Sequence, residues 1–132
     1  MSALGKEAQS LSIQDFEPYQ IVYLEATGDR LFSEMVQMAE GKQTCWVRPL
    51  VLVFDYYQLS DQPCEWFDLR NGSDLLCPST LFQAALDTDV IPFLSQLPPL
   101  VQGGRCDRAV QQRLNQFMRR LWEIHSDAFH AS

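Results

Sequence analysis

The feature that most constrains this chain is the block from Gln20 to Leu86, which has the pattern of consecutive short β-strands rather than of helix. Its clearest strand runs from Thr44 to Phe54, where β-branched and aromatic residues dominate. Pro49 lies inside that strand. Because proline lacks the amide hydrogen that a sheet ladder needs, it predicts an edge position or a β-bulge that bends the strand, as small barrels require.

Four shorter strands are expected around this one, each bounded by turn residues. The pair Asn71-Gly72 is the strongest turn signal, because both residues tolerate positive φ. The segment 31–39 also suits a helix, since Met, Glu, Gln and Ala favour that state, and its strand prediction depends on the turns at either end. The expected strands are 19–27, 31–39, 65–70 and 74–77, followed by a tight helical turn over 78–82.

Two helices are expected after the strands. The run Asp87-Thr88-Asp89 predicts a helix start with Asp as its cap, and Pro98-Pro99 stops that helix after Leu97. Asp107 caps a longer helix that runs to about Ser126, where apolar residues recur at helical spacing. The apolar positions are Val110, Leu114, Phe117, Met118, Leu121, Trp122 and His125, and Arg108, Arg113, Arg119 and Arg120 lie mostly off that stripe.

These elements predict an α+β fold, in which a bent antiparallel sheet or partly open small β-barrel of about five strands has the C-terminal helix packed against it. The chain of 132 residues has the length of one domain. Residues 1–18 are expected to form a loosely ordered lead-in and 19–132 a single domain. Within it, 19–86 is β-rich, 87–97 is a short helix and 107–126 is the C-terminal helix.

The charge of the chain is negative and unevenly distributed. The formal net charge is −7, and residues 1–100 carry five Lys or Arg against fourteen Asp or Glu, whereas residues 101–132 carry five against three. An acidic surface repels polyphosphate, so nucleic acid is not expected as a partner. The acidic body suits a basic partner and the terminal helix an acidic one, unless the charge serves solubility alone.

Cysteine spacing and hydropathy bear on the compartment. Cys45, Cys64, Cys77 and Cys106 form no CxxC pair, which disfavours a zinc knuckle and a thioredoxin-like redox pair. No secretory signal pattern is visible at the start, and no apolar run approaches 18 residues, so no membrane span is expected. These observations predict a cytoplasmic setting with free thiols.

Residues with catalytic or ligand-binding chemistry form no recognisable constellation. His125 and His130 are five residues apart, whereas a helical metal pair needs a spacing of three or four. The segment 68–74 has the oxygen ligands and glycine of a calcium loop but not its register. No phosphate-binding glycine loop is present, so neither cofactor nor metal is expected. A Cys–His nucleophile pair stays open, because such partners meet in space rather than in sequence.

An aromatic group is the most suggestive feature for binding. Trp66 and Phe67 are neighbours on an expected strand and therefore face opposite ways, so one of them lies on the outer face or under the C-terminal helix. If the helix does not cover these aromatics, they form an exposed patch of the kind that binds proteins. The candidate partner-binding residues are Arg48, Phe54, Tyr56, Tyr57, Trp66 and Arg70.

Three segments carry a family resemblance: Trp46-Val47-Arg48-Pro49-Leu50, the stretch from Asp68 to Pro78 (DLRNGSDLLCP), and the stretch from Ala85 to Pro92 (ALDTDVIP). In these the chain resembles small uncharacterised cyanobacterial proteins over about residues 20–125. The resemblance implies a cytosolic or thylakoid-surface setting in a photosynthetic bacterium and transfers no catalytic residue. The layout is also similar to small barrel interaction modules of the Sm or Tudor kind, which is a likeness of fold and not of function.

The function expected from these observations is that of a non-enzymatic adaptor or assembly factor that binds another protein. Its contact would use the strand-end aromatics or the arginine-bearing helix face, and a homodimer through the same surface is a variant. The alternative is a small-molecule-binding or enzymatic domain with a pocket between sheet and helix, where a Cys or Asp does the chemistry. One fast-reacting cysteine would favour that alternative.

Overall fold

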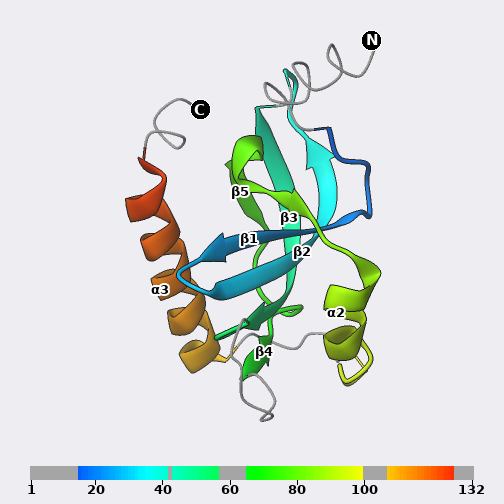
Figure 1. Cartoon of the computed structure of the whole chain (residues 1–132), viewed down its shortest axis with the longest axis vertical. Helices are drawn as coiled ribbons and strands as arrows, with labels where there is room; N and C mark the ends of the chain where they lie inside the picture. Colours follow the sequence, from blue (N-terminus) through cyan, green and yellow to red (C-terminus); the bar gives the residue numbers. More distant parts are fainter. Residues whose placement is uncertain (1–14, 42, 57–64, 100–106, 127–132) are drawn as a thin grey trace.

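A computed structural model describes residues 15–41, 43–56, 65–99 and 107–126 of the chain. They form a bent, open antiparallel sheet with helices against it, which confirms the predicted α+β fold and is not a closed barrel (Figure 1). The strands are β1 (Ile21–Ala26), β2 (Asp29–Met38), β3 (Thr44–Val53), β4 (Trp66–Asp68), β5 (Leu75–Pro78) and β6 (Gln83–Ala84), and the helices are η1 (Ser79–Leu81), α2 (Asp87–Leu94) and α3 (Arg108–Ile124). None of these helices is long and apolar enough to cross a membrane.

The long strand β3 organises the sheet. The strand order is β4-β3-β2-β1-β6, and β5 pairs with β3 as well, so the two short strands share one edge of β3. The register changes from Phe32 opposite Val51 to Ser33 opposite Pro49, which leaves Leu50 as the extra residue. This is the bulge that Pro49 predicts, and it separates the part of β3 that pairs with β4 from the part that pairs with β5.

The β1–β2 hairpin explains why the segment 31–39 is a strand and not a helix. Thr27 and Gly28 both have positive φ (49° and 89°), as a tight hairpin turn requires, and Ala26 pairs directly with Asp29. Residues 29–33 are all buried, because β2 is covered on both faces. Its sequence therefore lacks the apolar–polar alternation of a strand with one exposed face.

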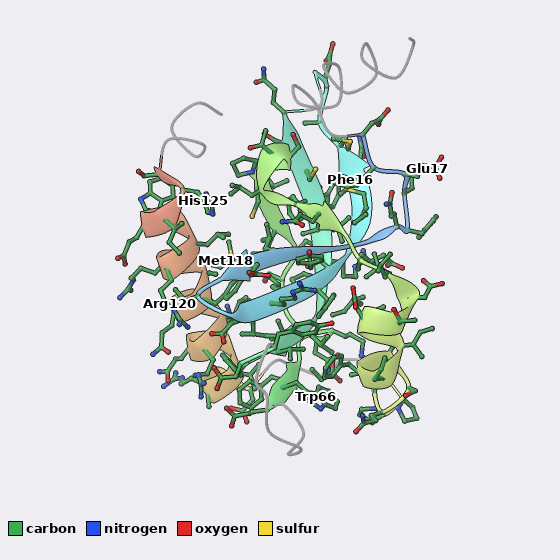
Figure 2. All side chains as sticks on the ribbon, viewed as in Figure 1. Phe16, Glu17, Trp66, Met118, Arg120 and His125 are labelled. Atoms are coloured by element: carbon green, nitrogen blue, oxygen red, sulfur yellow. The ribbon has the colours of Figure 1, made fainter. Side chains whose placement is uncertain are left out.

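The sheet has a separate core on each face, and α3 and α2 lie on opposite sides of it (Figure 1). Leu114, Phe117 and Leu121 of α3 are buried in the larger core, and Met118 packs at its margin between helix and sheet (Figure 2). Phe16, within the expected lead-in 1–18, is also buried there. The strand residues of this core are Val22, Leu24, Ala26, Leu31, Met35, Cys45, Val47, Leu52 and Cys77.

The smaller core lies between the sheet and α2, and the sequence did not indicate it. It contains Tyr23, Phe32, Val51, Val53 and Val90 as buried residues. The strand residues among them alternate with those of the larger core, as the two faces of a pleated sheet require.

Both helices end earlier than predicted, α2 at Leu94 and α3 at Ile124. Helix α3 begins as expected, with the Asp107 carboxylate accepting a hydrogen bond from the Ala109 amide at 2.9 Å. Helix α2 is shorter than 87–97, and its N-cap is Leu86 rather than Asp87. Because Leu86 has no side-chain acceptor, the acidic Asp87 and Asp89 favour this helix start through the helix dipole alone.

Candidate functional site

The structure divides the predicted aromatic group between the two cores. Phe54 is only 6% exposed and packs edge-to-face with Phe67, with 5.6 Å between ring centroids, on the α3 side of the sheet. Tyr56 and Trp66 pack on the α2 side, where the Trp66 ring lies 6.0 Å from that of Phe93 (Figure 2). Tyr57 lies outside the described residues. These aromatics therefore do not gather on one surface.

Arg30 explains the position of Tyr56. Its guanidinium carbon lies 4.1 Å from the ring centroids of both Tyr23 and Tyr56, and its side chain is only 8% exposed. The Arg30 Nε donates to Glu25 at 3.1 Å, and Asp89 of α2 lies 4.0 Å from the Arg30 Nη1. This arrangement links the hairpin to the start of α2 and leaves the arginine little surface for a ligand.

Arg70 has a comparable structural role. It donates two hydrogen bonds of 3.0 Å to the two carboxylate oxygens of Asp68 and another to the Pro98 carbonyl. Burial would raise the pKa of Asp68, but the hydrogen bonds and charge of Arg70 outweigh it and hold that pKa below its ordinary value. Arg70 therefore joins β4 to the segment after α2.

Among the described strand residues, the exposed large apolar side chains lie elsewhere, on β3 and β5. Trp46 and Leu76 are direct cross-strand partners and are 40% and 70% exposed. The Asp74 carboxylate accepts from Trp46 Nε1 at 2.8 Å and from Arg48 Nε at 3.4 Å. We call Trp46, Leu76, Arg48 and Asp74 the Trp46 surface. Shallow hollows of about 340 and 200 Å³ adjoin it, and both are lined by Trp46 and Leu76.

The Trp46 surface follows from the alternation of β3. Cys45 and Val47 point into the core against α3, so Trp46 and Arg48 point to the other face. Helix α2 packs over the opposite half of that face, and among the described residues no helix covers the half beyond the Pro49 bulge. Of the predicted partner-binding residues that the structure describes, Arg48 lies here. Sequence reasoning did not include Trp46 among the candidate binding residues, although its alternation with Cys45 and Val47 was the signal.

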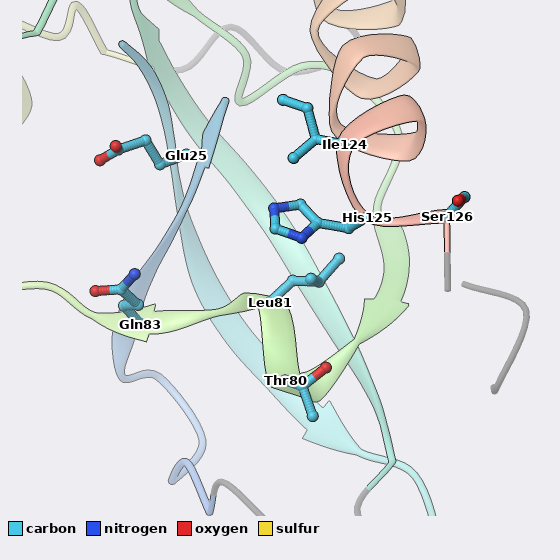
Figure 3. A pocket seen from close by; sticks show the side chains of 7 residues that line it. All are labelled: Glu25, Thr80, Leu81, Gln83, Ile124, His125 and Ser126. Atoms are coloured by element: carbon cyan, nitrogen blue, oxygen red, sulfur yellow. The ribbon is translucent and has the colours of Figure 1, made fainter. Parts of the chain in front are cut away.

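A cleft of about 460 Å³ between α3 and the η1–β6 edge contains residue types used in catalysis (Figure 3). The His125 ring points into it, but the Ser126 hydroxyl points away from that ring. Glu25 also points away and accepts a hydrogen bond from Arg30 at 3.1 Å. The three groups therefore do not form an acid–base–nucleophile arrangement in this geometry.

A second cleft, of about 410 Å³, lies between α3 and the β1–β2 turn. Two ion pairs cross it, from Arg120 to Asp29 at 3.3 Å and from Arg113 to Glu65 at 3.7 Å. Arg120 also donates to the Thr27 hydroxyl at 3.0 Å. The Arg120 contacts attach the helix to the hairpin, and the Arg113 ion pair attaches it to the residue before β4.

The two described thiols are poorly suited to nucleophilic chemistry. Cys45 and Cys77 are free, buried and opposite each other in the β3–β5 register. Burial raises the pKa of Cys45 to about 11, and burial together with the neighbouring Cys45 raises the pKa of Cys77 to about 12. Cys64, Cys106 and His130 lie outside the described residues. Within the described ranges, no three His, Cys, Asp or Glu side chains are grouped to hold a metal ion.

Comparisons of this chain with protein-family models, with curated proteins and with solved structures found no match. The resemblance to small uncharacterised cyanobacterial proteins therefore stays a prediction, and any function has to be argued from the surfaces described above.

Proposed function

We propose that this chain is a non-enzymatic protein-interaction domain, an adaptor or assembly factor, that binds a partner protein through the Trp46 surface. The observation that carries the proposal is the exposed cross-strand pair Trp46–Leu76 on a rigid sheet. Burial of a large apolar side chain contributes about 1.5–3 kcal/mol of transfer free energy, and Trp and Arg are enriched among the residues that dominate binding.

The polar groups at this surface favour specific recognition over non-specific apolar association. Asp74 fixes the indole through its N–H and holds Arg48 beside it, so the apolar area has a defined orientation before a partner arrives. Residues 1–100, which contain the Trp46 surface, carry a net charge of −9, which would steer a partner with a basic surface towards this part of the chain.

The setting that we propose for this interaction is the cytoplasm of a cyanobacterium, as the predicted resemblance implies. The facing free thiols of Cys45 and Cys77 support a reducing compartment.

The test is affinity purification of the full chain from its native host, followed by quantitative mass spectrometry. We expect a stoichiometric partner with the wild type and at least a tenfold lower recovery with Trp46→Ala or Leu76→Asp. Ile91→Ala is the matched control, because Ile91 is an exposed apolar residue on α2, outside the Trp46 surface. Circular dichroism of each variant would establish that it is folded.

Three results would contradict the proposal. They are equal recovery of the partner with all variants, co-purification of a metabolite alone, and capture of a second copy of the chain alone. The last would make the Trp46 surface a homodimer interface.

A further inference from the structure

The outer edge of β5, on the side away from β3, has no strand paired with it in the described ranges (Figure 1). Because β5 is only four residues long, one or two of its residues determine what this edge can bind. In an antiparallel ladder, residues alternate between hydrogen-bonded pairs, whose N–H and C=O groups point to the neighbouring strand, and non-hydrogen-bonded pairs, whose groups point away from it. The backbone groups that β5 leaves free therefore follow from its place in this alternation.

A backbone hydrogen bond at the end of β5 fixes the alternation. The β3–β5 register places Ser79 opposite Gln43, and the Ser79 amide donates to the Gln43 carbonyl at 2.9 Å. These two residues therefore form a hydrogen-bonded pair. Leu76 is three positions further along the ladder, so its pair with Trp46 is of the non-hydrogen-bonded kind.

The other side of β3 gives the same result. The Ala39 amide donates to the Thr44 carbonyl at 2.8 Å, which directs the backbone groups of Thr44, and of Trp46 two residues later, to β2. Trp46 therefore offers no backbone hydrogen bond to Leu76. The N–H and C=O of Leu76 point away from β3, to the open edge.

The side chains beside this edge are apolar. Leu76 is 70% exposed, and a non-hydrogen-bonded pair brings its side chain close to that of Trp46. A hollow of about 340 Å³, lined by Trp46, Asp74 and Leu76, adjoins the pair. Proteins commonly protect an open strand edge with charged side chains, lysine above all, whereas β5 has none among its four residues. The edge therefore combines free backbone groups with an apolar surface.

We propose that the partner protein binds by β-strand addition, with an extended segment pairing with the outer edge of β5. Leu76 donates its N–H to the segment and accepts from it at its C=O. The segment residue opposite Leu76 turns its side chain to the same face, where an apolar side chain fits the hollow beside Trp46. This inference rests on the function proposed for the Trp46 surface and specifies the conformation that the partner presents there.

An extended segment is favoured over a helix as the occupant. The backbone groups of a helix are bonded within the helix, so a helix on this surface would take the Leu76 N–H and C=O out of water without giving them partners. An extended segment satisfies both groups, and its side chains alternate in the same way as those of β5. The net charge of −9 over residues 1–100 favours a segment with basic residues at positions that face solvent.

The test removes the Leu76 amide hydrogen with little change to the side chain. Leu76→Pro and Leu76→Val leave the same number of side-chain carbons, but only the valine variant keeps the N–H. Because this N–H points away from β3, proline costs no bond in the sheet, and Pro78 already occupies an equivalent outward position in β5. In affinity purification from the native host, we expect Leu76→Pro to recover at least fivefold less partner than Leu76→Val, with equal urea midpoints for the two variants.

Hydrogen exchange of the amides, followed by NMR, reads the same group without a substitution. In the free chain, we expect the Leu76 amide to exchange at least tenfold faster than the Cys77 amide, which points to β3. When the partner purified with the wild type is added, exchange of the Leu76 amide should slow at least tenfold.

The proposal is overturned if Leu76→Pro recovers as much partner as Leu76→Val, if the Leu76 amide is already protected in the free chain, or if the partner leaves its exchange unchanged. In each of these cases, a partner that is lost with Trp46→Ala still supports the Trp46 surface. Recovery of no partner, of a partner that Trp46→Ala retains, or of a second copy of the chain alone would overturn both this proposal and the function on which it rests.

Discussion

At the scale of single residues, the structure shows why some side chains of chemical interest serve the fold. Arg30 is held between two tyrosine rings and two carboxylates, and Arg70 is held by Asp68 and Pro98. An arginine with this many partners contributes to stability through its neighbours, because removing it leaves partly buried acids without a counter-charge.

Arg30→Met is expected to lower the free energy of unfolding by about 2–4 kcal/mol, because it removes both ring contacts and leaves Glu25 and Asp89 without their cation. Urea titration followed by circular dichroism measures this change. Arg119→Met, at an exposed site, is the control and should change stability by less than about 0.5 kcal/mol. Equal effects of the two substitutions would contradict the role given to Arg30.

The raised pKa values of Cys45 and Cys77 predict that both thiols react slowly with a thiol reagent at pH 8. In the variant Cys64→Ser/Cys106→Ser, which leaves only these two cysteines, we expect labelling of the native chain at least a hundredfold slower than in urea. Absorbance of the released thiolate gives the rate. One rapidly labelled cysteine in the native state would instead favour the enzymatic alternative.

At the scale of elements, β2, β3 and α3 could be predicted from the sequence, and other features could not. Pro49 and the turn residues determine the bent strands, and Asp107 with its apolar stripe determines the last helix. The two-residue β6 has too few residues for any pattern. The second core was hidden because α2 is short and its packing on Phe32 and Val53 is a long-range contact.

The candidate site was less predictable than the fold. Phe54 and Trp66 are residue types that are common in binding patches. However, tertiary packing, and not the local sequence, decides which aromatic side chains the helices cover. Trp46 could have been found from its alternation with Cys45 and Val47. The exposure of Leu76 depends on the pairing of β5 with β3, which no pattern within β5 determines.

Helix α3 offers a test of local structure. Asp107→Ala removes the side-chain acceptor for the Ala109 amide and is expected to lower the free energy of unfolding by about 1 kcal/mol. Asp107→Asn is the matched comparison and should retain most of the stability, because an amide oxygen also caps. Urea midpoints of the three proteins decide this, and an unchanged midpoint for Asp107→Ala would show that the cap contributes nothing.

The Asp68–Arg70 pair predicts how stability depends on pH at the junction of β4 with the segment after α2. Because the pKa of Asp68 is lower in the folded chain than in the unfolded one, the pair stabilises the fold above about pH 4, and this stabilisation is lost as the pH falls through the folded-state pKa. Asp68→Asn should therefore be less stable than the wild type at pH 7 and lose less stability between pH 7 and pH 3. Glu17→Gln, at an exposed acid, should follow the wild-type profile, and an identical profile for Asp68→Asn would refute this assignment.

At the scale of the whole molecule, one helix packs on each face of a single sheet. The Trp46 surface lies on the part of one face that α2 does not cover. In the described residues, the clefts between helix and sheet contain ion pairs or groups that do not converge. This distribution of side chains supports the proposal that the domain binds a partner protein through its outer surface.

The most direct test of this account replaces Leu76 with the photo-cross-linking residue p-benzoylphenylalanine in the native host, with the same replacement at Ile91 as the control. The account predicts that irradiation joins position 76 to one protein partner, and that the product disappears when Trp46→Ala is added. The absence of a product, an equal yield of the same product from position 91, or a product containing only a second copy of the chain would contradict it.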